Sequence, residues 1–171
     1  MSVPHTEGRI SAVKTAADMR TVAALAREIW TEHYTPIIGA GQVEYMLNYM
    51  QSMAAIRGQC ADGCRYYLWH VDDEPAGYCA GDPEVPRGTL WVSKLYVRKD
   101  CRGRGGGRHM MDFLAERARE WSLQRLRLGV NRNNRGAIAA YRKMGFNVYG
   151  KRVKKIGRGF VMDDYMLEKK V

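Results

Sequence analysis

A loop rich in glycine and arginine is the part of this sequence best suited to hold a charged ligand. The stretch from 102 to 108 contains three arginines and four glycines, between a strand-like apolar run and a helical pattern that continues to about Ser122. The first turn of a helix presents unpaired backbone N–H donors at its positive end, and glycine lets a ligand approach them. Because arginine adds fixed charge and forked donors, the loop predicts a site for a diphosphate. Its residues are Arg102, Gly103, Arg104, Gly105, Gly106, Gly107 and Arg108.

Other ligand-binding motifs fit this loop less well. A P-loop requires Gly-x-x-x-x-Gly-Lys-Ser/Thr, but the glycine run ends here in Arg108 and His109. The fingerprint Gly-x-Gly-x-x-Gly fails from Gly103, where the sixth residue is Arg108, and from Gly105, where it is Met110. Arg-Gly-Gly segments that bind RNA are usually repeated and disordered, whereas this loop is single and lies between a strand and a helix. A merely flexible turn would explain the glycines but not the arginines.

Two spacings in the chain match the motifs of one known family. Arg102, Gly105 and Gly107 satisfy Arg-x-x-Gly-x-Gly, and the downstream run 128–146 fits Asn-x-x-Ala-x-x-x-Tyr-x-x-x-Gly-Phe. The residues in register with the second motif are Asn134, Ala137, Tyr141, Gly145 and Phe146. In these motifs the chain resembles the GNAT-type N-acetyltransferases, over about residues 89–168 and more loosely before them. The resemblance implies a single GNAT-like domain over residues 1–171 that binds acetyl-CoA, with the pyrophosphate at the glycine loop.

The elements around the motifs predict an α/β domain of the layered α+β kind, with a GNAT-like mixed, mostly antiparallel sheet flanked by helices. Pro36 is expected to end the first helix, and a turn at Asp72–Asp73 separates two strands. Asn134 is the expected N-cap of the last helix and Gly145 its C′ residue. The summed order is βααβββαβαββ. The predicted ranges are strand 9–14, helices 15–34 and 42–58, strands 64–72, 74–82 and 88–97, a helix from the loop to 122, strand 124–130, a helix within 134–146, and strands 146–156 and 159–169.

The resemblance also implies roles for residues outside the loop. The strand that ends in Leu95, Tyr96 and Val97 resembles the family strand that splays away from its neighbour. Its free backbone would pair with the pantetheine arm, and one N–H would polarise the acetyl carbonyl. Asn134 would both cap its helix and contact the cofactor. Lys143 is either a phosphate contact or a solvated surface lysine.

Tyr141 is the expected general acid. It lies four residues after Ala137, hence on the same helical face, where a phenol can protonate the departing sulfur; core packing is the alternative interpretation. The general base is not assigned, because Ser93 stands near the position where some polyamine-acetylating relatives carry a carboxylate. The residues that could serve directly or through water are Glu32, His33, Glu44, Asp163 and Asp164. Some relatives in the resembled family manage instead with ordered water and backbone carbonyls.

In the resembled family, the first two helices and the last strand pair enclose the acceptor. These segments are similar to those of small-molecule acetyltransferases, polyamine-acetylating ones included, so the expected acceptor is a primary amine of a small molecule. Glu32, Tyr34 and Tyr45 are the expected substrate residues, because the rings can line a groove and the carboxylate can attract an amine. Trp30 fits the core between the helices better. The basic run 151–158 opposes a polycationic acceptor if it borders the groove.

Composition limits the remaining classes of protein. With 171 residues, 46% of them hydrophobic and 27% charged, the chain fits one ordinary globular domain. No apolar run approaches the roughly 18–20 residues that span a bilayer. The N-terminus also lacks the apolar core of a secretory signal, so we expect a cytoplasmic protein without a membrane partner. The four cysteines and four histidines do not have the spacing of a metal site, and no metal is expected.

The net charge of +10 favours anionic partners without naming one. Besides a small amine, a peptide N-terminus and a protein lysine stay open as acceptors. A nucleic-acid-binding domain that uses the basic loop and hairpin is the alternative of a different class, although the leading interpretation expects no nucleic acid. A GNAT-shaped module that binds a CoA ester without turnover is a third function. Dimers are frequent in the resembled family, so a homodimer is among the expected assemblies.

Overall fold

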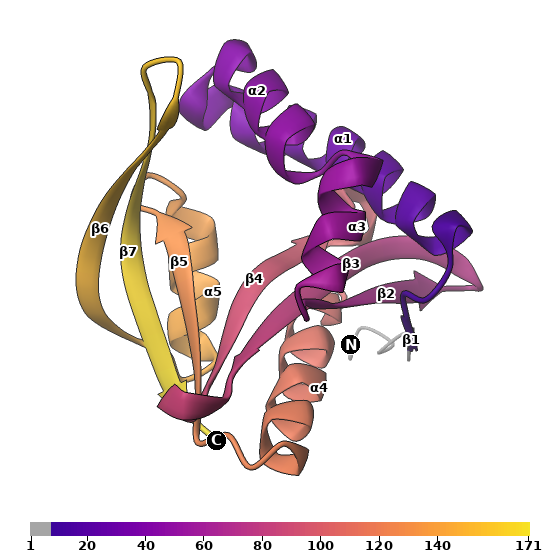
Figure 1. The fold of residues 1–171 in the computed structure, drawn as a ribbon, viewed down its shortest axis with the longest axis vertical. Helices are drawn as coiled ribbons and strands as arrows, with labels where there is room; N and C mark the ends of the chain where they lie inside the picture. Colours follow the sequence, from indigo (N-terminus) through magenta and orange to yellow (C-terminus); the bar gives the residue numbers. More distant parts are fainter. Residues whose placement is uncertain (1–7) are drawn as a thin grey trace.

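Seven strands form one sheet in the order β1-β2-β3-β4-β5-β7-β6 in the computed structural model of the chain, which describes residues 8–171 (Figure 1). The strands are β1 (Arg9–Ala12), β2 (Arg65–Val71), β3 (Glu74–Glu84), β4 (Thr89–Val97), β5 (Arg125–Asn131), β6 (Asn147–Gly157) and β7 (Phe160–Lys170). The helices are α1 (Ala16–Ile38), α2 (Ala40–Met50), α3 (Met53–Ala61), α4 (Gly106–Glu120) and α5 (Arg135–Lys143), with short 3-10 turns at Val85–Arg87 and Lys99–Cys101. All neighbouring strands are antiparallel except β4 and β5. This mixed sheet flanked by helices confirms the predicted fold class.

The first third of the chain holds three helices where the sequence predicted two, so the observed order is βαααβββαβαββ. The predicted helix 42–58 is divided after Gln51, because the hydroxyl of Ser52 accepts a hydrogen bond from the N–H of Ala55 at 3.1 Å and starts α3. The predicted break at Pro36 was wrong, since α1 continues past it. A proline in a helix removes one hydrogen bond and crowds the preceding turn, but here α1 ends only two residues later, at Ile38.

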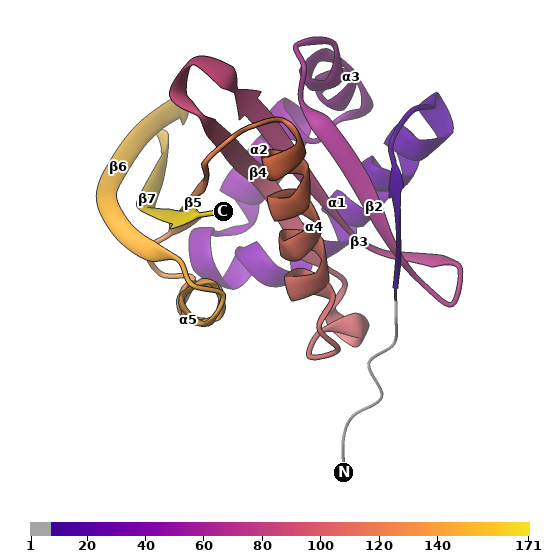
Figure 2. The same ribbon diagram turned by 90° about the horizontal axis from the view of Figure 1, so that it is seen from below.

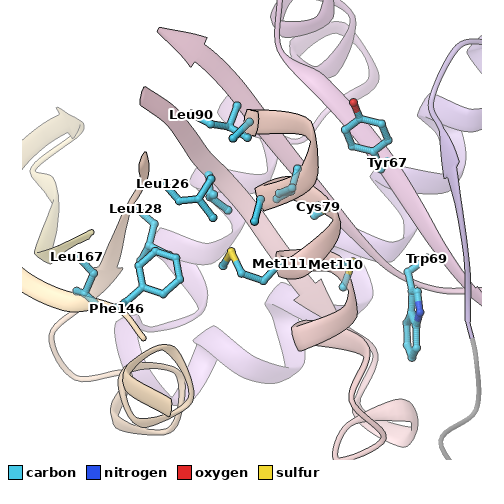
Figure 3. Close-up of a cluster of buried hydrophobic side chains, with 14 of the residues drawn as sticks. Tyr67, Trp69, Cys79, Leu90, Met110, Met111, Leu126, Leu128, Phe146 and Leu167 are labelled. Carbon is cyan, nitrogen blue, oxygen red and sulfur yellow. The ribbon is translucent and has the colours of Figure 1, made fainter. Parts of the chain in front are cut away.

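Two hydrophobic clusters cover the two faces of the sheet. The first lies under α4 and α5 and contains Met110 and Leu126, two of the side chains labelled in Figure 3. The second lies under α1–α3 and contains Ile29 and Ile56. Figure 2 shows α4 on the side of β2–β4 away from α1. Residues 1–7, part of the segment compared with a secretory signal, lie outside the described residues.

The strands β4 and β5 pair only at their beginnings. Their register extends from Thr89 to Trp91 of β4, and the two strands then separate toward α1 (Figure 1). A bulge at Ser93 adds one residue to β4, which shifts its register with β3. The second half of β4 therefore keeps β3 on one edge, whereas the other edge has no partner strand within residues 8–171.

Candidate active site

A cavity of about 200 Å³ lies where β4 and β5 separate. Its walls come from α1, α2, the second half of β4, β5, the start of α5, and β7, so segments from both ends of the chain meet there. Seven of the predicted site residues are in these walls. They are Tyr34, Leu95, Tyr96, Val97, Arg102, Asn134 and Tyr141. The remaining loop residues follow β4 at the start of α4, whereas Glu32, Tyr45 and Lys143 are not in the walls.

The open edge of β4 runs along the cavity. Leu95, Tyr96 and Val97 pair with β3 on one side and line the cavity on the other. Because the N–H and C=O groups of a strand point alternately to its two edges, some of them are directed away from β3 and remain unpaired. An extended ligand with amide groups can pair with such an edge as an added strand does.

The loop glycines meet two different requirements, and Gly107 meets neither of them. Gly103 and Gly105 have φ values of 75° and 84°, in the left-handed region that favours glycine. Gly106 faces the indole of Trp69, and a Cβ there would stand 2.6 and 2.8 Å from Cζ3 and Cζ2 of the ring. Gly107 lies in the first turn of α4, where a Cβ would meet no atom closer than 4.0 Å. Since no side chain caps α4, its first N–H donors remain for an anion.

The three loop arginines are not equivalent. Arg102 forms a two-point ion pair with Glu32, with nitrogen–oxygen distances of 3.2 and 2.8 Å. The hydrogen bond from Arg102 lowers the pKa of the Glu32 carboxyl. Arg108 donates to the carbonyl oxygen of Lys143 at 3.2 Å and so ties α4 to α5. Arg104 is exposed. Two groups predicted to bind different ligands, the Glu32 carboxylate and the Arg102 guanidinium, thus neutralise each other.

Three tyrosines meet at the cavity. The hydroxyl oxygens of Tyr34 and Tyr96 are 3.4 Å apart, and the Tyr96 ring lies 5.3 Å from that of Trp30, which is buried in the second cluster. The ring of Tyr141 packs edge-on against Phe146 at 5.8 Å. Burial raises the pKa of Tyr141, and the nearby Tyr34 adds to this effect. The Tyr141 hydroxyl therefore stays protonated at neutral pH, which is the state that a proton donor needs.

Asn134 stands at the N-cap position of α5 as predicted, but its side chain does not cap the helix. The Oδ1 atom is hydrogen-bonded instead to Nε2 of His33 in α1, at 3.2 Å. This contact joins α1 to α5 across the cavity and leaves the first turn of α5 without a side-chain cap. Gly145 has a φ of 95° and ends α5, as predicted. Lys143 is exposed in the last turn of that helix.

Two residues that the sequence analysis did not single out belong to the site. Lys94 lines the cavity, and burial lowers the pKa of its ammonium group. Strand alternation alone does not predict its direction, because the bulge at Ser93 precedes it. Trp69 sets the position of α4 through its contact with Gly106, and a tryptophan in an apolar strand carries no signal of that contact.

The tip of the β6–β7 hairpin is fastened to α2 by contacts that we call the α2–hairpin clasp. The Tyr45 hydroxyl donates to the carbonyl oxygen of Ile156, and Nε2 of Gln42 donates to that of Val161 at 2.7 Å. The Tyr45 ring also lies 5.4 Å from the ring of Phe160. The clasp bridges α2 and β7, two walls of the cavity, and Tyr45 holds this bridge rather than lining the cavity.

The hairpin that carries the basic run 151–158 borders the cavity. Met162 and Asp164 of β7 are in its wall, and the guanidinium of Arg152 in β6 lies 5.3 Å from the centre of the Trp91 ring. The lysines of the run are exposed on β6. None of the residues 151–158 is in the cavity wall, and Arg152 is the member of the run whose charge acts on a wall residue, Asp164.

All four cysteines are free thiols. Within residues 8–171, no three side chains of His, Cys, Asp or Glu are grouped closely enough to hold a metal ion. None of the helices described for this chain has the length and apolar character needed to cross a membrane.

Comparisons with known proteins agree with this geometry. The model of the acetyltransferase (GNAT) family matches residues 23–146. An uncharacterised N-acetyltransferase of Lactobacillus delbrueckii subsp. lactis is 33% identical over 113 residues, which are 63% of this chain and 65% of that protein. Streptothricin acetyltransferase of Streptomyces lavendulae is 34% identical over 93 residues, 54% of this chain and 49% of that protein. The matches thus span about half to two thirds of the length of these curated relatives.

A solved structure gives the same fold. The PaiA N-acetyltransferase from Thermoplasma acidophilum, in complex with coenzyme A, superposes with a TM-score of 0.77 at 20% identity. The superposition covers 95% of this chain and 99% of that one. At this identity the likeness concerns the fold alone.

Proposed function

Because the chain belongs to the acetyltransferase (GNAT) family, we propose that it is an N-acetyltransferase that moves the acetyl group of acetyl-CoA to the primary amine of a small molecule. The observation that carries the proposal is the open edge of β4, which is followed, after the turn Lys99–Cys101 and the glycine loop, by the uncapped first turn of α4. An extended amide chain that ends in a diphosphate needs these two features side by side.

The residues present fit acetyl-CoA, which would supply the thioester as the acetyl donor. The first-turn N–H groups of α4 and the guanidinium of Arg104 would hold the diphosphate, at a loop whose Gly103 and Gly105 already have left-handed φ values. The backbone of 95–97 would hold the amide arm, and one of its N–H groups would polarise the acetyl carbonyl. Tyr141, protonated at neutral pH, would give its proton to the leaving sulfur.

The α2–hairpin clasp supports a small acceptor. A peptide that entered between α2 and β7 would have to displace the hydrogen bonds that Tyr45 and Gln42 make to the hairpin backbone. The charge of Arg152 close to the wall residue Asp164 disfavours a polyamine and favours an acceptor with a single amine. The Streptomyces relative is named for the small molecule streptothricin, which agrees with this class of acceptor.

The test is release of the CoA thiol from acetyl-CoA, measured across a panel of primary amines and amino acids together with a peptide that has a free N-terminus. We expect turnover with one or more small amines and none with the peptide. Turnover with the peptide alone would move the acceptor to proteins. Melting curves recorded with CoA and with an oligonucleotide complete the test, because a ligand of the native state must raise Tm. A rise with the oligonucleotide and none with CoA would refute the proposed function.

A further inference from the structure

We propose that the carboxylate of Asp164 in β7 accepts the proton that the acceptor ammonium must lose before its nitrogen can attack the acetyl group. The inference rests on the proposed function, since only an amine acceptor requires this step. A primary amine is largely protonated at neutral pH, and its nitrogen then has no free lone pair. A group in the cavity that takes this proton, directly or through one water molecule, is therefore part of the chemistry.

Asp164 is selected by the positions of the groups that could act as a base. Three of the five candidates are carboxylates that form ion pairs and are absent from the cavity walls. They are Glu32 with Arg102 at 2.8 Å, Glu44 with Arg27 at 3.1 Å, and Asp163 with Arg132 at 3.0 Å. The fourth, His33, lines the cavity, but its Nε2 is hydrogen-bonded to Asn134. Asp164 also lines the cavity, and within residues 8–171 no ion pair or hydrogen bond engages its carboxylate.

The backbone around Asp164 leaves room for its carboxylate. Asp164 pairs with Asn131, beyond the point where β5 has parted from β4, so it lies at the opening between these strands. Gly129 lies two residues before Asn131 on β5, and a Cβ there would stand 3.2 Å from Oδ2 of Asp164 and 3.7 Å from Nη2 of Arg152. Asp164 is only 5% exposed, so a cation that reached it would be largely shielded from water. A buried carboxylate without an ion-pair partner is unfavourable, and the ammonium group of the acceptor would supply that partner.

The charged groups near Asp164 come from several elements. Arg152 of β6 is the nearest cation that affects it, and Asp163 of β7 is the neighbouring anion. From α1, Tyr34 and His33 face the same cavity, and from β4 so does Lys94. The residues of β5 and α5 beside Asp164 carry no charge. Burial raises the pKa of Asp164 more than Arg152 lowers it, so the carboxylate accepts a proton more readily than an exposed one does.

The proton transfer to Asp164 is compatible with Tyr141 as the proton donor to the sulfur. Asp164 takes one proton from the ammonium and becomes a neutral acid. The amine nitrogen then forms the C–N bond to the acetyl carbon as the C–S bond breaks. The Tyr141 hydroxyl gives its proton to the departing sulfur and recovers the second proton that the new amide nitrogen loses. Asp164 finally releases its proton to water, so one proton leaves for each acetyl group transferred.

The experiment compares two acceptors that differ little in size but strongly in basicity. Ethylamine is protonated at neutral pH, whereas trifluoroethylamine is largely neutral. We measure kcat/KM for both with the wild-type protein, with Asp164→Asn, and with Asp163→Asn as the matched control on the same strand. For Asp164→Asn we expect kcat/KM to fall roughly 100-fold with ethylamine and less than about threefold with trifluoroethylamine. The ethylamine rate of this variant should recover as the pH rises toward the pKa of the amine.

Each other outcome has a clear meaning. An equal loss with both amines would make Asp164 a structural residue, and no loss with either would remove it from the reaction; both results overturn the inference and leave the proposed function standing. A loss of the same pattern in Asp163→Asn would also overturn it. A rise in Tm with CoA shows that Asp164→Asn is folded and binds the donor. A wild type that releases no thiol with either amine, nor with any member of the acceptor panel, refutes the proposed function itself.

Discussion

Exchange of Gly106 for alanine tests how the glycine loop is held, and Gly107→Ala is its matched control one position further along α4. A Cβ on Gly106 would stand 2.6 and 2.8 Å from two carbon atoms of Trp69, which is 1% exposed and has little room to move. A Cβ on Gly107 would stand 4.0 Å from Cε of Met144, which is an ordinary contact. Both changes place alanine where a helix favours it by up to about 1 kcal/mol over glycine. Only Gly106→Ala adds an overpacking term of about 1–3 kcal/mol.

Helix propensity and overpacking together predict that the two substitutions change Tm in opposite directions. Gly106→Ala should lose about 1–2 kcal/mol net, which for a chain of this size lowers Tm by about 3–6 °C. Gly107→Ala should raise Tm by up to about 3 °C. Thermal unfolding followed by circular dichroism measures both, and a repeat with CoA measures donor binding. Because Trp69 positions the first turn of α4, Gly106→Ala should also weaken the stabilisation by CoA. If Gly106→Ala melts as high as Gly107→Ala, then Trp69 does not determine this position.

Three further substitutions or measurements test other parts of the site. Tyr141→Phe should lower kcat by roughly 100-fold while the CoA Kd stays within about twofold; an unchanged kcat would show that the proton comes from elsewhere. Glu32→Gln should destabilise the protein by at most about 1 kcal/mol at neutral pH, because its ion pair with Arg102 is partly exposed. Since Arg102 lowers the folded-state pKa of Glu32 from 4.5, that stabilisation is present above pH 4.5 and is lost as the pH falls through the folded-state pKa. Urea titrations of the wild type and Glu32→Gln at several pH values check this, and a difference in stability that persists in acid would contradict it. Burial raises the pKa of Cys64 to about 12 and raises that of Cys79 too, so mass spectrometry after iodoacetamide treatment at pH 8 should find both unmodified until the protein unfolds; rapid labelling of either in the folded protein would contradict their burial.

Much of the architecture follows from local patterns in the sequence. The strand pairs were predicted from alternation and from turn residues, and the turns at Asp72 and Gly157 indeed have positive φ values. The glycine loop was predicted to start a helix, and α4 begins at Gly106. Such features depend on residues close together in the chain, where backbone preference and hydrophobic periodicity act directly.

The features that could not be predicted depend on contacts between distant residues. The sequence gives no sign that the Arg102 guanidinium has a partner, but it forms an ion pair with Glu32, seventy positions earlier. The partners of Gln51 at the end of α2 are also distant, because its buried amide is hydrogen-bonded to the hydroxyls of Tyr66 and Tyr78 on the sheet. These partners are set by the packing of helices on the sheet, which one sequence does not reveal.

The candidate site shows the same division. The cofactor side was predicted from two motifs that each lie within a short stretch, and the residues 95–97 and Tyr141 do meet at one cavity. The acceptor side was predicted less well, because it is assembled from α1, α2 and β7, which are far apart in the chain. Asp164 stood among five equal candidates until the fold showed that three of them form ion pairs and that Nε2 of the fourth, His33, is hydrogen-bonded to Asn134.

The extra residue in β4 has a consequence for how this segment can change in length. Before Ser93 the even-numbered side chains face α4, as Val92 does, and after it the odd-numbered ones do, as Leu95 does. Deletion of Ser93 would remove the extra residue and leave a regular strand, in which Leu95 still faces α4 and Tyr96 still faces the three N-terminal helices. Loss of one residue elsewhere in β4, with the bulge retained, would instead exchange the apolar and the phenolic faces of the half-strand. Ser93 is therefore the position in β4 where a change in length leaves the direction of the later side chains unchanged.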